Sequence, residues 1–187
     1  MTTDFRRHFT EHQKLVEKSV DALEIASEAA SRALVSALAA GNKVLTLGNG
    51  GSSAEASHLA EELVGRYRKT RRPFPALCLT SDSATVTCIA NDFGYEAVFD
   101  RQVEAFAQKG DVVVALTTSG KSENVLRALR TAKAQGAVTI ALTGQAGLNG
   151  VDADHVVSVP STDSAYIQEV HLMLIHVWCE AIDSALA

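Results

Sequence analysis

Five short apolar runs, separated by helical stretches, restrict the folds open to this chain more than any other feature. The runs cover residues 43–47, 76–79, 111–116, 137–142 and 155–159. Nearly continuous apolar runs that contain β-branched residues are typical of strands buried on both faces of a parallel sheet. Predicted helices between the runs cover residues 53–66, 83–91, 95–108 and 122–135. This alternation predicts an α/β fold with a doubly wound, five-stranded parallel sheet of the flavodoxin-like kind.

Two further helical segments flank this predicted core. Residues 3–40 are polar at first and then rich in alanine, with larger apolar residues at intervals of three and four, which predicts a helix or a helix pair. A last, largely apolar helix is expected from about Ser164 onward. No linker or repeat divides the 187 residues, so we expect a single domain over 1–187. Within it, the helical segment 1–41 is expected to pack on the sheet and on other subunits.

The composition makes several classes of partner improbable. The 17 Lys and Arg residues are outnumbered by 22 Asp and Glu, and this balance disfavours nucleic-acid binding. The one basic cluster, Arg66–Arg72, is either a solvated loop or part of an anion site or subunit contact.

Cys78, Cys88 and Cys179 form no C-x-x-C motif, which favours a reducing compartment and buried thiols. With neither a signal-peptide pattern nor a run of about 18 apolar residues, the expected location is the cytoplasm, without membrane contact.

Polar, glycine-containing loops follow the first and third predicted strands. The first, residues 48–53, reads GNGGSS, and its glycines allow positive φ and close backbone approach. The second, residues 117–124, reads TTSGKSEN and offers four hydroxyl groups before a helix start. Ligands of doubly wound sheets bind at the carboxyl ends of strands, near the switch in strand order. The two loops together therefore predict one phosphorylated ligand.

Other interpretations of these loops have less support. The first could be a simple turn in which Ser52 or Ser53 caps the next helix, and the second could likewise be mere capping. A nicotinamide site is disfavoured because Ser53 stands where the dinucleotide fingerprint requires a third Gly or Ala. The second loop lacks the glycine spacing of a Walker A motif. We therefore expect no nucleotide cofactor.

The helix after the first loop carries a candidate acid–base or metal set. His58 and Glu62 are spaced i, i+4, so they share a helix face, and Glu61 is nearly as close. One imidazole and one carboxylate on one face form either a metal half-site, an acid–base pair or a surface ion pair.

The last predicted helix holds Gln168, His171 and His176 among apolar residues. Gln168 and His176 are separated by about 12 Å along a regular helix and by about 80° in azimuth. One metal bound by both would require an irregular helix start or residues from two subunits. Gln168 with His171 is the easier pair on a single helix.

Over nearly its whole length the chain resembles the SIS domain family and, within it, the phosphoheptose isomerases. The motifs that carry the resemblance are LGNGGSS, HLAEELVGRY, ANDFGY, TTSGKSENV, ALTGQAG and IQEVHLMLIH. The resemblance implies conversion of sedoheptulose 7-phosphate to D-glycero-D-manno-heptose 7-phosphate through an enediol, as the entry to activated heptose for lipopolysaccharide or related glycans. It also implies a homotetramer with active sites at subunit interfaces and one zinc ion per subunit.

The resemblance further implies roles for individual residues. Glu62 and His176 are the expected acid–base pair. The expected zinc ligands are His58, Glu62, Gln168 and His176, so the resemblance prefers His176 to His171. The expected substrate contacts are Asn49, Gly50, Gly51, Ser52, Glu62, Asn91, Asp92, Thr117, Thr118, Ser119, Ser122 and Gln168. Two positions depart from the family pattern. Thr117 replaces a common serine, and Tyr166 stands where some members have a basic residue.

Two other functions remain open at this point. Some proteins similar to this chain are non-catalytic and bind the replication initiator DnaA, but they lack the glutamate found here as Glu62. Other members of the fold isomerise different sugar phosphates. Glu62 together with His58 favours an enzyme over a binding protein.

Overall fold

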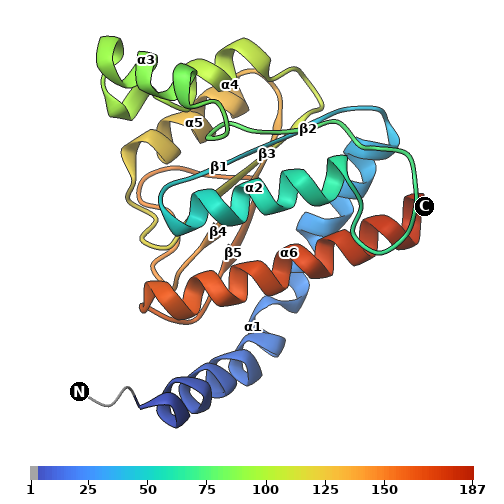
Figure 1. Cartoon of the computed structure of the whole chain (residues 1–187), viewed down its shortest axis with the longest axis vertical. Coiled ribbons are helices and arrows are strands. Elements are labelled where there is room, and N and C mark those ends of the chain that lie inside the picture. The colour runs from blue at the N-terminus through green and yellow to red at the C-terminus, as the bar shows by residue number, and fades with distance from the viewer. Residues whose placement is uncertain (1–3) are drawn as a thin grey trace.

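The computed structural model describes residues 4–187, whose core is a five-stranded parallel sheet (Figure 1). Its strands are β1 (Val44–Gly48), β2 (Ala76–Cys78), β3 (Val112–Thr117), β4 (Val138–Thr143) and β5 (His155–Ser158). The spatial order is β2-β1-β3-β4-β5. Each strand overlaps a predicted apolar run and begins and ends within about one residue of it. The predicted fold class is therefore confirmed.

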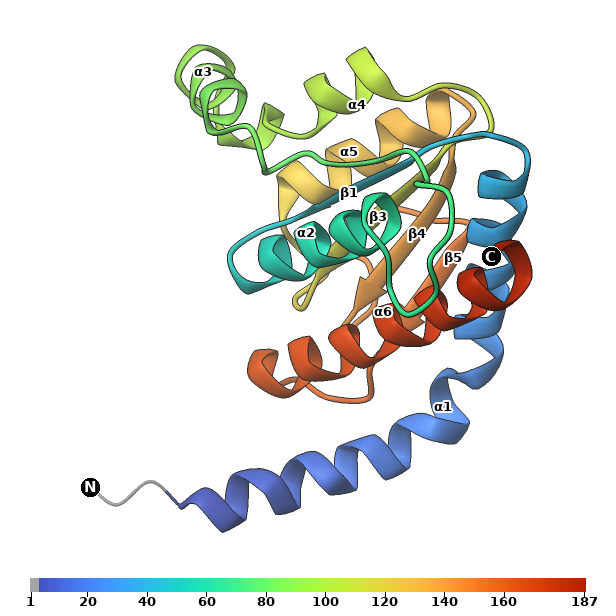
Figure 2. The same cartoon turned by 45° about the vertical axis from the view of Figure 1, so that its right-hand side comes forward.

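Helices cover both faces of this sheet. They are α1 (Phe5–Ala39), α2 (Gly51–Val64), α3 (Ser83–Phe93), α4 (Asp100–Phe106), α5 (Glu123–Ala134) and α6 (Ser164–Leu186), with a short 3-10 turn, η1 (Tyr95–Ala97). The N-terminal segment, predicted as a helix or a helix pair, is a single helix of 35 residues. Its first half runs along the outside of the molecule next to α6 (Figure 2). None of the helices within residues 4–187 is long and apolar enough to cross a bilayer.

The sheet divides the core into two layers. Helices α1, α2 and α6 pack on one face, whereas η1, α4 and α5 pack on the other. Alternate residues of a strand face opposite layers, and in β3 this places Val112, Val114 and Leu116 in the first layer. Val113 and Ala115 belong to the second. Burial on both faces explains why the strands read as continuous apolar runs.

The strand order places the loops after β1 and β3 at the switch point of the sheet. From β1 the chain continues to β2 on one side, and from β3 it continues to β4 on the other. The ends of these neighbouring strands pair directly, with Gly48 opposite Leu116. A crevice between the two following loops is the expected ligand position in such sheets.

The basic segment Arg66–Arg72 is fixed to α6 by a buried carboxylate. Asp183 accepts hydrogen bonds from two backbone N–H groups of the segment and from Nε of Arg71, each at 3.0 Å. Arg71 also donates to the carbonyl oxygens of Glu62 and Leu63 at the end of α2. Burial alone would raise the pKa of Asp183, but these donors outweigh it and lower that pKa below its ordinary value. The segment therefore contains a buried structural clamp, a role not expected from the sequence.

The prediction that the thiols are buried is correct for two cysteines and wrong for the third. Cys78 and Cys179 are buried, whereas Cys88 is exposed. Cys88 lies on α3, where Ile89 is the buried residue of the helix. Because α3 projects from the edge of the molecule (Figure 1), an apolar sequence context there does not ensure burial.

Candidate functional site

A small cavity lies between the loops that follow β1 and β3. It has a volume of about 90 Å³. It is lined by Asn49, Ser52, Leu116, Thr117, Thr118, Ser119, Ser122 and Gln168. Pockets for whole ligands usually measure about 300–1,000 Å³, so this cavity suits one functional group of a ligand. The structure thus brings both predicted loops and Gln168 to one place.

Two glycines of the first loop are required for different reasons. One has a positive φ, and the other leaves no room for a side chain beside Gln168. Gly50 has φ +57° and is the N-cap residue of α2, without a side-chain capping bond. A Cβ atom added to Gly51 would lie 2.5 Å from the Gln168 side-chain amide, so a larger residue there would displace it. The alternative in which Ser52 or Ser53 caps α2 is therefore wrong, because the helix starts earlier, at Gly51.

The second loop combines fixed and available hydroxyl groups. Thr117 Oγ1 accepts a hydrogen bond from Gly120 N at 3.2 Å, and Ser119 Oγ accepts one from Lys121 N at 3.2 Å. Ser122 is the N-cap residue of α5, yet its side chain makes no capping bond. The Ser122 hydroxyl therefore remains available to a ligand at the positive end of the helix.

A pair of amide side chains joins the two loops. Asn49 and Asn124 donate to each other through Nδ2, and both hydrogen bonds measure 2.9 Å. Tyr95 donates its hydroxyl hydrogen to Oδ1 of Asn49 at 2.8 Å. Asn124 and Tyr95 were not among the predicted site residues. Nothing in the sequence pairs residues this far apart, although the position of Asn124 at the end of the hydroxyl-rich loop was a possible signal.

His58, Glu62 and His176 form a second cluster, between α2 and α6. Nε2 of His58 lies 3.0 Å from Nε2 of His176 and 3.4 Å from Oε1 of Glu62. One ligand atom from each residue lies within 4.8 Å of the others. The Glu62 side chain is only 13% exposed, which disfavours a solvated surface ion pair. The predicted shared face of His58 and Glu62 is thus observed, and α6 adds the second imidazole.

The donor atoms of this cluster fit a small divalent cation. Two imidazole nitrogens and one carboxylate oxygen are ligands that zinc prefers. Bonds of about 2.0–2.1 Å in a tetrahedral site separate neighbouring donor atoms by about 3.3 Å, close to the spacings found here. Nδ1 of His58 lies 3.2 Å from Oε2 of Glu61, and a carboxylate there favours a proton on Nδ1 and a free lone pair on Nε2. The Glu61 carboxylate is thus placed to orient the imidazole as metal ligands are commonly oriented.

The two alternatives for the last helix occupy different environments. His171 is fully buried, and its Nε2–H donates to the carbonyl oxygen of Thr143 at 3.2 Å. His176 belongs to the cluster with His58. Helix α6 is regular from Ser164 onward, so no irregular helix start brings Gln168 and His176 together. Gln168 lines the cavity near Gly51, and its role as a metal ligand stays a prediction.

Asn91 and Asp92 do not join the cavity. Both are exposed on α3, and Asn91 donates to Oδ1 of Asp92 at 2.7 Å. Helix α3 projects from the molecule (Figure 1) and packs mainly against η1. Tyr95, just beyond this helix, contacts the site instead, through its hydrogen bond to Asn49.

Comparisons with known proteins agree with this arrangement. The family model described as the SIS domain matches residues 7–144. The phosphoheptose isomerase of Aliarcobacter butzleri is 45% identical over 183 residues, which cover 97% of this chain and 96% of the relative. That of Nitratiruptor sp. is 45% identical over 186 residues, covering 99% and 100%. The solved structure of a phosphoheptose isomerase from Francisella tularensis has a TM-score of 0.91 and 36% identity, covering 98% of this chain and 100% of that one. The chain therefore belongs to the SIS domain family and, within it, to the phosphoheptose isomerases.

Proposed function

We propose that this isomerase converts sedoheptulose 7-phosphate to D-glycero-D-manno-heptose 7-phosphate through an enediol. The proposal rests on the positions of two sites along helices α2 and α6. The hydroxyl-lined cavity lies at the start of α2 and α6, and the cluster of His58, Glu62 and His176 lies further along both helices. An extended sugar phosphate has its anion at one end and its reacting carbons at the other. One such molecule can therefore occupy both sites.

The cavity is the proposed phosphate site. Backbone N–H groups at the starts of α2 and α5, with hydroxyl groups of the second loop, can bind a phosphate without a fixed cation. Binding at this remote end supplies energy that positions C1 and C2 for reaction.

Glu62 and His176 are the proposed acid–base pair. Glu62 removes a proton from C1, and the electron pair of that C–H bond forms the C1–C2 double bond while O2 takes a proton from His176. The resulting enediol loses the proton of O1 to the imidazole and gains at C2 the proton that Glu62 holds. The sum is an isomerisation that needs no external oxidant or nucleotide.

Zinc, one ion per subunit, is the metal we infer for the cluster. His58, Glu62 and His176 would hold it through one atom each, with Gln168 as the predicted fourth ligand, so that the second carboxylate oxygen of Glu62 and Nδ1 of His176 would carry the protons that these two residues move. When bound, zinc polarises the substrate carbonyl and stabilises negative charge on its oxygen as a Lewis acid.

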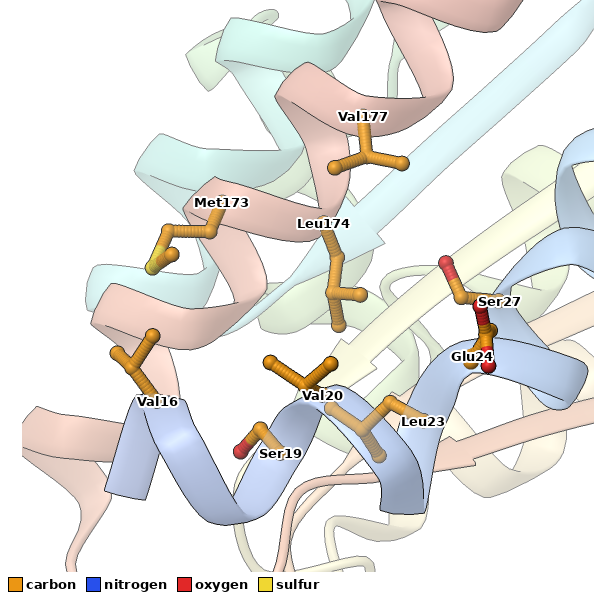
Figure 3. Close-up of a pocket in the computed structure, with 9 residues that line it drawn as sticks. All are labelled: Val16, Ser19, Val20, Leu23, Glu24, Ser27, Met173, Leu174 and Val177. Carbon is orange, nitrogen blue, oxygen red and sulfur yellow. The ribbon is translucent and has the colours of Figure 1, made fainter. Parts of the chain in front are cut away.

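We further propose a homotetramer whose active sites lie at subunit interfaces. It acts in the cytoplasm and supplies heptose for lipopolysaccharide or related glycans. An apolar groove between α1 and α6 supports association (Figure 3). Its lining includes the exposed side chains of Val20, Met173 and Val177. Asn91 and Asp92, exposed on α3, would meet sugar hydroxyls across a subunit interface.

Incubation with sedoheptulose 7-phosphate, followed by sugar analysis, tests the reaction. We expect the aldose product, with formation suppressed by a chelator and restored by Zn²⁺. Arabinose 5-phosphate at equal concentration serves as the competing substrate. Faster turnover of the pentose phosphate, or no turnover of either sugar, would contradict the proposed substrate.

A further inference from the structure

Glu55 on α2 and His171 on α6 face each other inside the molecule without completing a hydrogen bond. Oε2 of Glu55 lies 3.8 Å from Nδ1 of His171. The His171 side chain is fully buried, and that of Glu55 is only 12% exposed. Both atoms are buried and have no hydrogen-bond partner among the described residues. Buried polar atoms without partners are costly, so this pair requires an explanation.

The position of the hydrogen on the His171 ring explains why Nδ1 of His171 and Oε2 of Glu55 form no hydrogen bond. The carbonyl oxygen of Thr143 can only accept, so Nε2 of His171 carries a hydrogen. In the neutral ring Nδ1 is then an acceptor, and it faces a carboxylate oxygen that is also an acceptor. One hydrogen placed between Nδ1 and Oε2 satisfies both atoms, after a shift of about 1 Å brings them to hydrogen-bond distance.

The pair lies midway between the two parts of the proposed active site. On α2, Glu55 follows Gly51 by one turn and precedes His58 by one turn. On α6, His171 comes after Gln168 and before His176. The two helices thus approach closely where Gly51 faces Gln168, and their polar side chains face each other at this pair and at the His58–His176 cluster.

We propose that Glu55 is a positioning residue for the isomerisation and acts through His171. By sharing one hydrogen, the two side chains hold α6 in register with α2. The register determines where His176 stands relative to His58 and Glu62, because a slip of one residue moves a helical side chain by about 1.5 Å along the axis. A displacement of that order is enough to lower a reaction rate substantially. The inference rests on the proposed function.

Three substitutions in the full-length, zinc-loaded protein test the pair. Glu55→Leu removes the hydrogen-bonding atoms, and Glu55→Ala does the same without bulk if the leucine variant does not fold. Glu55→Gln keeps the shape and offers an amide N–H to Nδ1. The matched control is Glu180→Leu, which removes an exposed α6 carboxylate that pairs with Arg68. The measurements are kcat and KM for sedoheptulose 7-phosphate, Zn²⁺ affinity by chelator competition, and the melting temperature.

We expect Glu55→Leu to lower kcat by about tenfold or more with KM within about threefold, because the reacting groups move while phosphate binding remains. Zinc affinity should fall by about tenfold, as on loss of other supporting contacts of metal ligands. Glu55→Gln should recover most of both values, and Glu180→Leu should match the wild type. A leucine or alanine variant with unchanged kcat and zinc affinity would overturn the inference. So would a glutamine variant as impaired as the leucine variant, since the carboxylate itself would then be required.

The wild-type measurements separate this inference from the proposed function. If the wild type binds Zn²⁺ but does not turn over sedoheptulose 7-phosphate, the proposed substrate fails and the pair is judged on zinc affinity. If the wild type turns over the sugar without binding zinc, the proposed metal fails and the pair is judged on kcat. If it does neither, the inference and the proposed function fail together.

Discussion

Among single residues, Glu62 is the one on which the proposed chemistry depends most. Its side chain is largely buried and lies 3.4 Å from the imidazole of His58. We expect Glu62→Gln to lower turnover of sedoheptulose 7-phosphate by about 10²–10⁴-fold, the usual contribution of an acid–base group. Incorporation of solvent deuterium into the sugar should fall in parallel, which can be followed by NMR.

The neighbouring residue Glu61 supplies the control for this substitution. It is also a glutamate of α2, but its side chain is 64% exposed. Glu61→Gln keeps an oxygen for the His58 ring and should cost less than about tenfold. Equal losses in the Glu61 and Glu62 variants would contradict the assignment of the carbon acid chemistry to Glu62.

The thiols give a second prediction at the residue scale. Burial, together with the nearby charge of Glu62, raises the pKa of Cys179 to about 12, so this residue stays a thiol at neutral pH. Cys78 is buried as well, and Cys88 is exposed. A thiol-reactive chromogenic disulfide should therefore modify one cysteine in the native protein and all three after denaturation. Rapid modification of more than one cysteine before unfolding would be the contrary result.

At the scale of elements, the clamp between Asp183 and Arg71 joins the end of α2 to α6. Both side chains are almost fully buried. Asp183→Asn leaves the Arg71 guanidinium without its counter-charge, and we expect a loss of about 3–5 kcal/mol in the free energy of unfolding. Urea denaturation followed by circular dichroism measures this loss. Glu180→Gln, which disrupts an exposed pair with Arg68, should cost less than about 1 kcal/mol.

The same clamp predicts a pH dependence. Because the folded-state pKa of Asp183 is lowered, its contribution to stability is fully present above the ordinary value of 3.8. As the pH falls below that value toward the folded-state pKa, the contribution is lost. The difference in stability between the wild type and Asp183→Asn should therefore narrow in acid, and a difference that grows with acidity would be inconsistent with the clamp.

Local sequence determined most of these elements but not the contacts between them. The runs around Val113 and Ile140 predicted strands because burial on both faces leaves no polar alternation. The spacing of His58 and Glu62 predicted their shared face because a helix repeats every 3.6 residues. The Asn49–Asn124 amide pair and the Asp183 clamp escaped prediction because each joins residues far apart in the chain. A resemblance to a family was needed to favour His176 over His171.

At the scale of the whole molecule, the apolar groove between α1 and α6 is a surface that one copy of the chain leaves exposed over the described residues. Val177 is 54% exposed there, and Met173 is 44% exposed (Figure 3). Such contiguous apolar surface is typical of a subunit interface. Light scattering at micromolar concentration should therefore give a mass near that of four 19.8 kDa chains.

Val177→Glu tests whether this groove is the surface used. A charge buried in an apolar interface without a partner costs several kcal/mol, so the variant should dissociate into smaller species. Ala134→Glu, on the exposed side of α5 and across the sheet, adds the same charge and should leave the mass unchanged. Because the proposed active sites lie at interfaces, the Val177 variant should also lose activity as it dissociates, and activity should return in part at higher protein concentration. A Val177 variant that keeps the mass of the wild type would place the interface elsewhere on the molecule, whereas a dissociated variant with full activity would show that one chain holds a complete site.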